Sequence, residues 1–347
     1  MWQPGFPVSI RSPRSTIKFP THHIRRNLSI PSSISPSSKM APAKSITVIS
    51  SPYHLGVRDK AVGAGPTALI NAGLVSALRK LDVPVQEAEL EPVDEFDGEI
   101  GRLFELLRRT SKAVTRAVDA GSFPVVLSGN CSATVGVSAG ISGSRSFVDR
   151  RDQTASCVWF DAHDDYNTPD VLVSGYLDSM PVAMLEGAAW KTLLASIPGF
   201  RPMTLKRDLI HVGLRDVTEL ERSRVMDAGF AVVWGDTARH VDFAGELHKT
   251  LEEKKASLTP ACMVHLDLDA LDISVGGVNK FSAPGGLLEG DLVKCLEVIP
   301  RETRPVSLTV ASYDPSFDKE GRIPPVAVKA VVAFVKELVS EGVLVGE

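Results

Sequence analysis

Two short stretches place acidic side chains directly after an apolar run. Residues 161–165 read DAHDD, and residues 265–272 read HLDLDALD. Side chains two residues apart on an extended strand point to the same face of the strand. The spacing therefore predicts that Asp161 and His163 point the same way, together with Asp165 if the chain stays extended.

The same spacing predicts a shared face for Asp267 and Asp269. Neither stretch contains a lysine or an arginine. Carboxylates that crowd together in a poorly solvated place repel each other and lose hydration, so they need cations. Oxygen ligands with one imidazole suit a divalent metal ion, and a pair of ions is the simplest interpretation. The alternative is two acidic strand ends that pair with distant arginines.

The composition narrows the class of protein. The chain has 347 residues, of which 44% are hydrophobic, and a formal net charge of -4. This mild acidity gives no electrostatic footprint for nucleic acid, and no apolar run approaches the roughly 20 residues of a membrane span. We therefore expect neither nucleic acid nor a membrane as a partner. The four cysteines have no paired spacing, which predicts a reduced, intracellular protein: Cys131, Cys157, Cys262 and Cys295.

Residues 1–44 differ from the rest of the chain. They are rich in Ser, Pro and Arg, and no acidic residue occurs before Asp59. We expect a disordered basic leader here, which either resembles an organellar transit peptide or precedes a natural start at Met40. Residues 45–347 are expected to form one domain. The protein is then cytoplasmic, or mitochondrial if the leader is a transit peptide.

From residue 46 onward, apolar strand patterns alternate with helical patterns. Strands are expected at 46–49, 83–90, 124–127, 155–160, 208–214, 230–234, 261–268 and 305–312. Helices are expected at 67–81, 99–120, 180–186, 219–227, 245–253, 289–299 and 326–340. Such alternation predicts a parallel sheet covered on both faces, with its functional site at the carboxyl ends of the strands.

Three stretches together resemble the ureohydrolases, the family of arginase, agmatinase and formiminoglutamase. Residues 161–169 (DAHDDYNTP) resemble the first metal motif of that family, and residues 267–272 (DLDALD) resemble the second. Residues 283–287 (APGGL) resemble its Pro-Gly-Gly-Leu stretch. The resemblance extends from about residue 46 to the C-terminus. It implies a three-layer α/β/α fold with a mostly parallel sheet of about eight strands, and hydrolysis of C–N bonds in guanidino or formimino groups.

The resemblance also implies a site. Family members hold two manganese ions bridged by hydroxide, act on a small-molecule substrate and are homo-oligomers, trimers or hexamers. Asn167, Ser174 and Ser312 are then expected to bind the substrate, and Asp165 is expected to orient the hydroxide. When the family's ligand positions are matched to this sequence, the implied metal ligands are Cys131, Asp161, His163, Asp165, Asp267 and Asp269.

Three positions depart from the family pattern. Cys131 stands where the family has a metal-binding histidine, and a thiolate suits Zn²⁺ or Fe²⁺ better than Mn²⁺. Asp178 stands where a histidine commonly relays protons. Ser312 stands where members that bind guanidinium carry a glutamate, and a serine cannot supply a bidentate anion. Arginine is therefore a doubtful substrate.

The leading interpretation is a metal-dependent hydrolase of a linear guanidino, formimino or related amide-like C–N bond, in which Asp178 passes the proton to the leaving amine. A second is an enzyme with Cys131 as nucleophile, because a helix that begins near Ala133 would lower its pKa. A third is a non-catalytic relative that binds metal. His211 and His265 are expected to be hydrogen-bonded core residues.

Overall fold

The computed structural model describes residues 40–94, 98–148 and 154–346. Its main sheet has eight strands: β1 (Ser45–Ser51), β4 (Val85–Glu89), β5 (Ser122–Ser128), β6 (Ser156–Phe160), β7 (Leu209–Leu214), β8 (Ala231–Trp234), β9 (Ala261–Asp267) and β10 (Arg304–Ala311). Their order is β4-β1-β5-β10-β9-β6-β7-β8, and every pairing is parallel. β2 (Tyr53–His54) and β3 (Val57–Arg58) form a small antiparallel pair. The predicted parallel sheet of about eight strands is confirmed.

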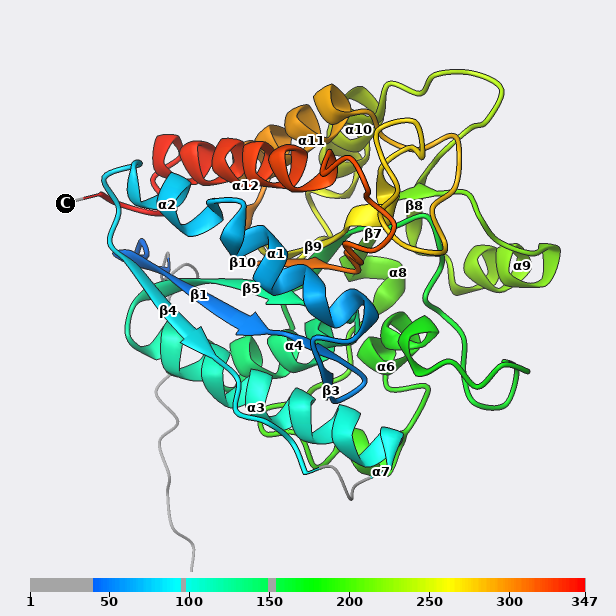
Figure 1. The fold of residues 1–347 in the computed structure, drawn as a ribbon, viewed down its shortest axis with the longest axis horizontal. Coiled ribbons are helices and arrows are strands. Elements are labelled where there is room, and N and C mark those ends of the chain that lie inside the picture. Colours follow the sequence, from blue (N-terminus) through cyan, green and yellow to red (C-terminus); the bar gives the residue numbers. More distant parts are fainter. Residues whose placement is uncertain (1–39, 95–97, 149–153, 347) are drawn as a thin grey trace, which may run out of the picture. The chain divides into compact units, whose positions relative to one another are not determined.

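Helices cover both faces of this sheet (Figure 1). One face carries α1 (Gly65–Asn71), α2 (Leu74–Arg79), α10 (Phe243–Lys254), α11 (Glu289–Glu302) and α12 (Ile323–Ser340). The other carries α3 (Glu99–Asp119), α4 (Ala133–Gly143) and α6 (Pro181–Glu186), with the shorter α5 (Arg145–Val148), α7 (Lys191–Leu194), α8 (Leu205–Asp208) and α9 (Glu219–Ala228). The predicted three-layer α/β/α arrangement is therefore confirmed.

The side-chain pattern explains why the layers form. All seven residues of β9 are buried, and their side chains alternate between the two faces of the sheet. Cys262, Val264 and Leu266 belong to the core beneath α10–α12, whereas Met263 belongs to the core beneath α3 and α4. An apolar run that is buried on both faces is typical of a central parallel strand.

The helix expected at 67–81 is broken in the structure. Gly73 has φ +93°, a left-handed conformation, and it separates α1 from α2. The stretch 61–79 is apolar and long enough to cross a membrane by length and composition, which corrects the expectation that no run reaches this length. However, Leu69, Leu74 and Leu78 pack into the core of the α/β domain, so the break and the packing favour a core role.

Helix α4 was expected only as a possible helix near Ala133. It is buried along nearly its whole length, so it lacks the polar face that makes an amphipathic helix recognisable. Gly136 and Gly140 let it approach α3 closely, because a Cβ at these positions would lie 2.8 Å from the Leu107 carbonyl oxygen and 2.6 Å from that of Ser111. This close approach fixes α4 against α3 on one face of the sheet.

The domain begins earlier than the predicted boundary at residue 45. The Met40 carbonyl accepts a hydrogen bond of 2.8 Å from the Arg304 guanidinium, and Ala43 forms a parallel bridge with Leu344. Residues 40–44 therefore pack as part of the domain, because their backbone groups form hydrogen bonds with residues in its C-terminal half. The rest of the predicted leader, residues 1–39, lies outside the described residues.

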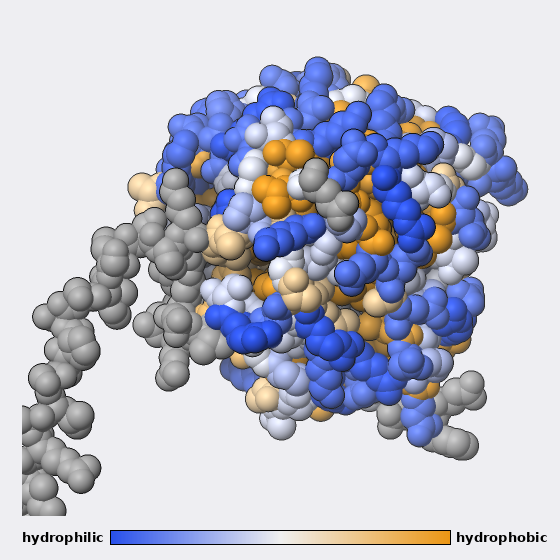
Figure 2. Space-filling model, turned by 90° about the vertical axis from the view of Figure 1, so that its left-hand side faces the viewer, coloured by the Kyte–Doolittle hydropathy of each residue, from blue (hydrophilic) through white to orange (hydrophobic). Residues whose placement is uncertain are grey.

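Parallel pairing brings all the strand ends to the same edges. The carboxyl ends of the neighbouring strands β5, β10, β9 and β6 meet at one edge of the sheet, where both acidic stretches follow. Figure 2 shows the face at the amino ends, where hydrophilic residues surround an apolar area near the centre.

Candidate active site

A cavity of about 440 Å³ lies at the carboxyl ends of the four central strands. Cys131 follows β5, Ser312 follows β10, Asp267 ends β9, and His163 comes after β6; all four line the cavity. Among the described residues that line it there is one lysine, Lys280, against eight carboxyl side chains: Asp164, Asp165, Asp178, Asp216, Glu221, Asp267, Asp269 and Asp314. The cavity is therefore suited to cations.

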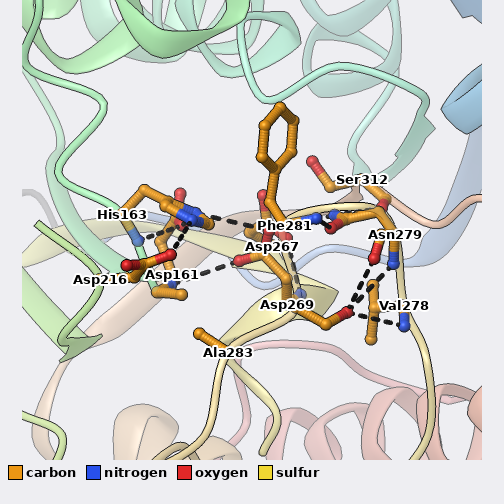
Figure 3. Close-up of polar contacts among 12 residues, drawn as sticks. Asp161, His163, Asp216, Asp267, Asp269, Val278, Asn279, Phe281, Ala283 and Ser312 are labelled. Carbon is orange, nitrogen blue, oxygen red and sulfur yellow. Dashed lines mark hydrogen bonds and ion pairs between the residues drawn. The ribbon is translucent and has the colours of Figure 1, made fainter. Parts of the chain in front are cut away.

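Asp161 and His163 lie close together, as predicted, although β6 ends at Phe160 and both residues follow the strand (Figure 3). Asp161 is buried, and its Oδ1 accepts a hydrogen bond of 2.8 Å from the His163 amide. The His163 Nδ1 lies 3.3 Å from Asp161 Oδ1 and 3.5 Å from Asp269 Oδ2, and its Nε2 lies 3.4 Å from Asp216 Oδ2. Burial lowers the pKa of His163, but Asp269, Asp161 and Asp216 raise it well above its usual value.

Asp165 does not continue the extended chain. Its φ is +48°, so the backbone turns there, and the conditional expectation of a third same-face residue fails for this reason. The turn still leaves the carboxylate buried in the cavity wall. Burial and the charges of Asp161, Asp178 and Asp267 raise its pKa well above the usual range. Its Oδ2 is buried and has no hydrogen-bond partner among the described residues.

Asp267 and Asp269 also meet, but not by strand alternation. Asp267 ends β9, whereas Asp269 lies in a short 3-10 turn, Leu268–Ala270, so the prediction of a shared strand face is wrong. The turn brings the Asp269 amide to 2.7 Å from Asp267 Oδ1. Burial and the charge of Asp269 raise the pKa of Asp267, whereas His163 brings the pKa of Asp269 below its usual value despite burial. The Asn279 side chain donates to Asp269 Oδ2 at 3.0 Å.

Cys131 reaches the same cluster from β5. Its buried thiol donates to Asp267 Oδ2 at 2.9 Å, and its Sγ lies 3.1 Å from Ser312 Oγ. The predicted helix behind it is present as α4. Nevertheless, burial and the charges of Asp267 and Asp178 raise the pKa of Cys131 well above its usual value. The site as described therefore holds a thiol and not an activated thiolate, which disfavours the nucleophile interpretation.

Asp178 lies between the cluster and the beginning of α4. Its Oδ2 accepts hydrogen bonds from the Asn130 side chain at 2.6 Å and from the Cys131 amide at 3.2 Å, and its Oδ1 accepts one from the Ser132 amide at 3.0 Å. Burial raises the pKa of Asp178 to about 6, although these donors oppose the shift. The carboxyl group lines the cavity, so it can meet a bound molecule while it holds the loop after β5.

The three expected substrate-binding residues all line the cavity in different environments. Asn167 is buried and its amide group is bonded to α9, donating to Glu221 at 3.0 Å and accepting from Arg224 at 2.6 Å. Ser174 is exposed. Ser312 is buried and has φ +67°, a left-handed conformation.

His211 and His265 are buried in the core, and in each ring one of the two nitrogen atoms has a hydrogen-bond partner. Nε2 of His211 lies 2.8 Å from the His163 carbonyl oxygen, and Nδ1 of His265 lies 2.7 Å from Thr134 Oγ1. The other nitrogen of each ring is buried without a hydrogen-bond partner among the described residues. Burial lowers the pKa of both histidines to about 3, so both rings are neutral.

Arg215 was missed in the sequence, although it organises the loops around the site. Its guanidinium donates to carbonyl oxygens of six residues: Gly213, Asp269, Ala270, Leu271, Ala283 and Pro284. Asp272 holds the same region, because its Oδ2 accepts hydrogen bonds from the amides of Gly285 at 2.6 Å and Gly286 at 3.2 Å. A lone arginine after a strand carries no sequence signal for such a role.

The parallel α/β/α fold and the buried cluster of oxygen, nitrogen and sulfur ligands define a metal-binding hydrolase of the ureohydrolase type. The donor set fits divalent ions, because the imidazole Nδ1 of His163 faces two carboxylates and Asp165 keeps an unpartnered oxygen. Among the described residues, two groups could hold an ion by the closeness of their ligand atoms: Asp161, His163 and Asp269, and Cys131, Asp161 and His265.

Comparisons with known proteins agree with this class. The model of the arginase family matches residues 44–336. The arginase of Staphylococcus aureus is 26% identical over 310 residues, which cover 86% of this chain and 99% of that protein. The crystal structure of Bacillus subtilis arginase superposes with a TM-score of 0.70 at 23% identity, and covers 84% of this chain and 98% of that one.

The formimidoylglutamase of Bacillus subtilis has a TM-score of 0.65 at 16% identity, over 86% of this chain and 88% of that one. At these identities the solved structures show the fold alone. The match to the family model extends over most of the chain, and the chain therefore belongs to the arginase family.

Proposed function

We propose that this protein hydrolyses a linear C–N bond in a guanidino, formimino or related amide-like compound, with arginine a poor substrate, and that it does so with two divalent metal ions. The observation that carries the proposal is the cluster of Asp161, His163, Asp165, Asp267 and Asp269, in which the four carboxyl groups are buried and every residue except Asp161 lines the cavity. Membership of the arginase family supports the reaction class.

The raised pKa values argue for cations in this cluster. Burial and mutual repulsion raise the pKa of Asp161, Asp165 and Asp267, so the charged forms of these groups are unfavourable in the folded protein unless cations are bound. Asp161, His163 and Asp269 would hold one ion, and Cys131 would hold the second ion together with Asp161, beside Asp165 and Asp267. When bound, the ions would lower the pKa of water and polarise the carbon under attack. Manganese is the typical ion of the family, whereas Cys131 favours Zn²⁺ or Fe²⁺.

The chain's own groups supply the remaining chemistry. Asp165 accepts a hydrogen bond from the attacking water through its unpartnered Oδ2. Asp178 gives its proton to the leaving amine, since a carboxyl group with a pKa of about 6 is partly protonated near neutral pH. Phe281 packs edge-on against His163 at 5.8 Å between ring centroids and lines the same cavity (Figure 3).

Ser312 supports the exclusion of arginine. Its buried hydroxyl lies 3.1 Å from Cys131 Sγ and can offer one neutral hydrogen bond. A guanidinium group favours a planar carboxylate that accepts two parallel hydrogen bonds. A substrate with a smaller or less basic head group needs no such partner, which favours formimino or amide-like compounds.

The test begins with metal analysis of the full chain purified without chelators. A panel of guanidino, formimino and acylamino compounds then follows, with the release of urea, ammonia or amine as readout. We expect about two divalent ions per chain and turnover of at least one compound that is not arginine. Rapid hydrolysis of arginine would contradict the substrate proposal. Metal binding without turnover of any compound would support the non-catalytic alternative.

The remaining expectations are part of the same proposal. We propose one catalytic domain behind a basic leader, an intracellular location, and a homo-oligomer, which in the family resemblance is a trimer or hexamer. Mitochondrial targeting finds no support in the comparisons. Light scattering of the purified chain measures the oligomeric state, and fractionation of cells that express the full chain measures the location.

A further inference from the structure

A buried histidine lies beside the metal cluster but outside the family's ligand set. One ring nitrogen of His265, the Cys131 sulfur and a carboxylate oxygen of Asp161 all lie within 4.8 Å of one another. All three side chains are at most 2% exposed. In a tetrahedral zinc site the donor atoms would be about 3.4–3.6 Å apart, given the usual Zn–S and Zn–N lengths. The limit of 4.8 Å is wider than this spacing, so binding of an ion would draw the three ligand atoms closer together.

The hydrogen bonding of His265 leaves one nitrogen available to an ion. Its Nδ1 lies 2.7 Å from Thr134 Oγ1, whereas Nε2 is buried without a hydrogen-bond partner among the described residues. With the proton on Nδ1, the ring donates to Thr134 and Nε2 keeps its lone pair. Metal-bound histidines commonly donate their other ring N–H in this way, which fixes the tautomer and the orientation of the ring.

Trp159 holds two members of the group in place. Its ring stacks on that of His265 with centroids 3.7 Å apart, and its Nε1 donates to Asp161 Oδ2 at 3.0 Å. The two stacked residues face each other in register on the adjacent strands β6 and β9. The imidazole and the carboxylate are therefore positioned before any ion arrives.

The replacement at position 131 explains why this histidine would be used. A cysteine side chain is shorter than that of the histidine expected there by resemblance, so an ion on its sulfur lies closer to the sheet. His265 projects from β9, a strand of that sheet, and Cys131 lines the cavity, which gives an ion a path. An imidazole from a neighbouring strand can thus replace the one missing at position 131.

We propose that Cys131, Asp161 and His265 form a mixed thiolate, carboxylate and imidazole site that prefers Zn²⁺ to Mn²⁺. Binding replaces the thiol proton, which is released to solvent. Sulfur and nitrogen ligands suit zinc, whereas manganese prefers oxygen ligands. A catalytic role for this site rests on the proposed function. Binding of the ion does not depend on that function.

The experiment uses Co²⁺ and Zn²⁺ as probes on the full chain. After removal of endogenous metal, Co²⁺ should produce a thiolate-to-cobalt charge-transfer band in the near ultraviolet, and zinc X-ray absorption should show one sulfur at about 2.3 Å. Cys131→Ser should abolish the cobalt band. His265→Asn should weaken Zn²⁺ affinity at least tenfold and alter the visible cobalt bands, because the ion loses a nitrogen ligand.

His211→Asn is the matched control, since His211 is also buried with one unpartnered nitrogen but lies outside the group. It should leave the Zn²⁺ affinity and the cobalt spectrum unchanged. If His265→Asn fails to fold, Thr134→Val removes the group that orients the ring, and should weaken Zn²⁺ about tenfold or more. A folded His265→Asn protein with wild-type Zn²⁺ affinity and cobalt spectrum overturns the proposal, as does an unchanged affinity in Thr134→Val.

Turnover separates this proposal from the proposed function. Loss of zinc ligation in His265→Asn without turnover of any compound by the wild type would support the site and contradict the enzyme. If the wild type turns over a compound but its zinc X-ray absorption spectrum shows no sulfur ligand, the proposed function is supported and the site with Cys131 is contradicted.

Discussion

Ser312→Glu should create activity toward arginine. Ser312 already holds the left-handed φ of +67°, so the backbone strain is present in the wild type and a glutamate adds little to it. Its backbone is also held, because the Asn279 side chain donates to the Ser312 carbonyl oxygen at 2.9 Å. A longer side chain at this position cannot fill the space of the Cys131 sulfur, 3.1 Å from the present hydroxyl, and therefore extends into the cavity.

The magnitude follows from the type of hydrogen bond. A charge-assisted hydrogen bond contributes about 1.5–3 kcal/mol, which corresponds to roughly a tenfold to hundredfold gain in kcat/KM for arginine. Ser312→Gln is the matched control, because it has the same reach without the charge. A neutral hydrogen bond contributes about 0.5–1.5 kcal/mol, so its gain should be roughly tenfold smaller.

The assay measures urea release from arginine at equal metal content, since an added carboxylate beside Asp267 also changes the binding of cations. The Glu variant should exceed both the wild type and the Gln variant. If the two variants gain equally, reach and not charge limits the reaction. If neither gains while both retain wild-type metal content, the assignment of Ser312 to the guanidinium position is wrong.

Three further predictions follow from the contacts of the site. The double substitution of Asp161 and Asp267 by Ala should abolish the binding of divalent ions, and unchanged metal stoichiometry by elemental analysis would contradict the cluster as a metal site. Burial lowers the pKa of His211 to about 3, so below about pH 6.5 this histidine binds a proton in the unfolded chain but not in the folded protein. The free energy of unfolding therefore falls as the pH is lowered below about 6.5. His211→Asn should reduce this fall by up to about 1.4 kcal/mol per pH unit, measured by urea unfolding. Arg215→Lys should lower the free energy of unfolding by about 3 kcal/mol or more, because one ammonium group cannot reach the carbonyl oxygens of six residues; a urea midpoint shift under a third of that would argue against a structural role.

Local patterns were sufficient for the architecture. A strand that is buried on both faces must be apolar along its length, and β5, β6 and β9 are so in the sequence. Helices that cover a sheet must carry an apolar stripe, as α3 does with Leu103, Leu106 and Leu107. Local patterns were insufficient where they carry no signal. Helix α4 is buried on all sides and has no apolar stripe to mark it. The break at Gly73 was not predicted, because the sequence remains apolar on both sides of it.

The sequence by itself determined which residue types gather at the site, because strand ends carry them to one edge of any parallel sheet. It also indicated the nearness of Asp161 and His163, which are two residues apart directly after the end of β6. The tertiary structure alone decided how Asp165 and Asp269 turn toward them, because a left-handed residue and a 3-10 turn leave no hydrophobic pattern. It alone brought His265 beside Cys131, since the order of the strands, and not the distance along the chain, sets which side chains meet.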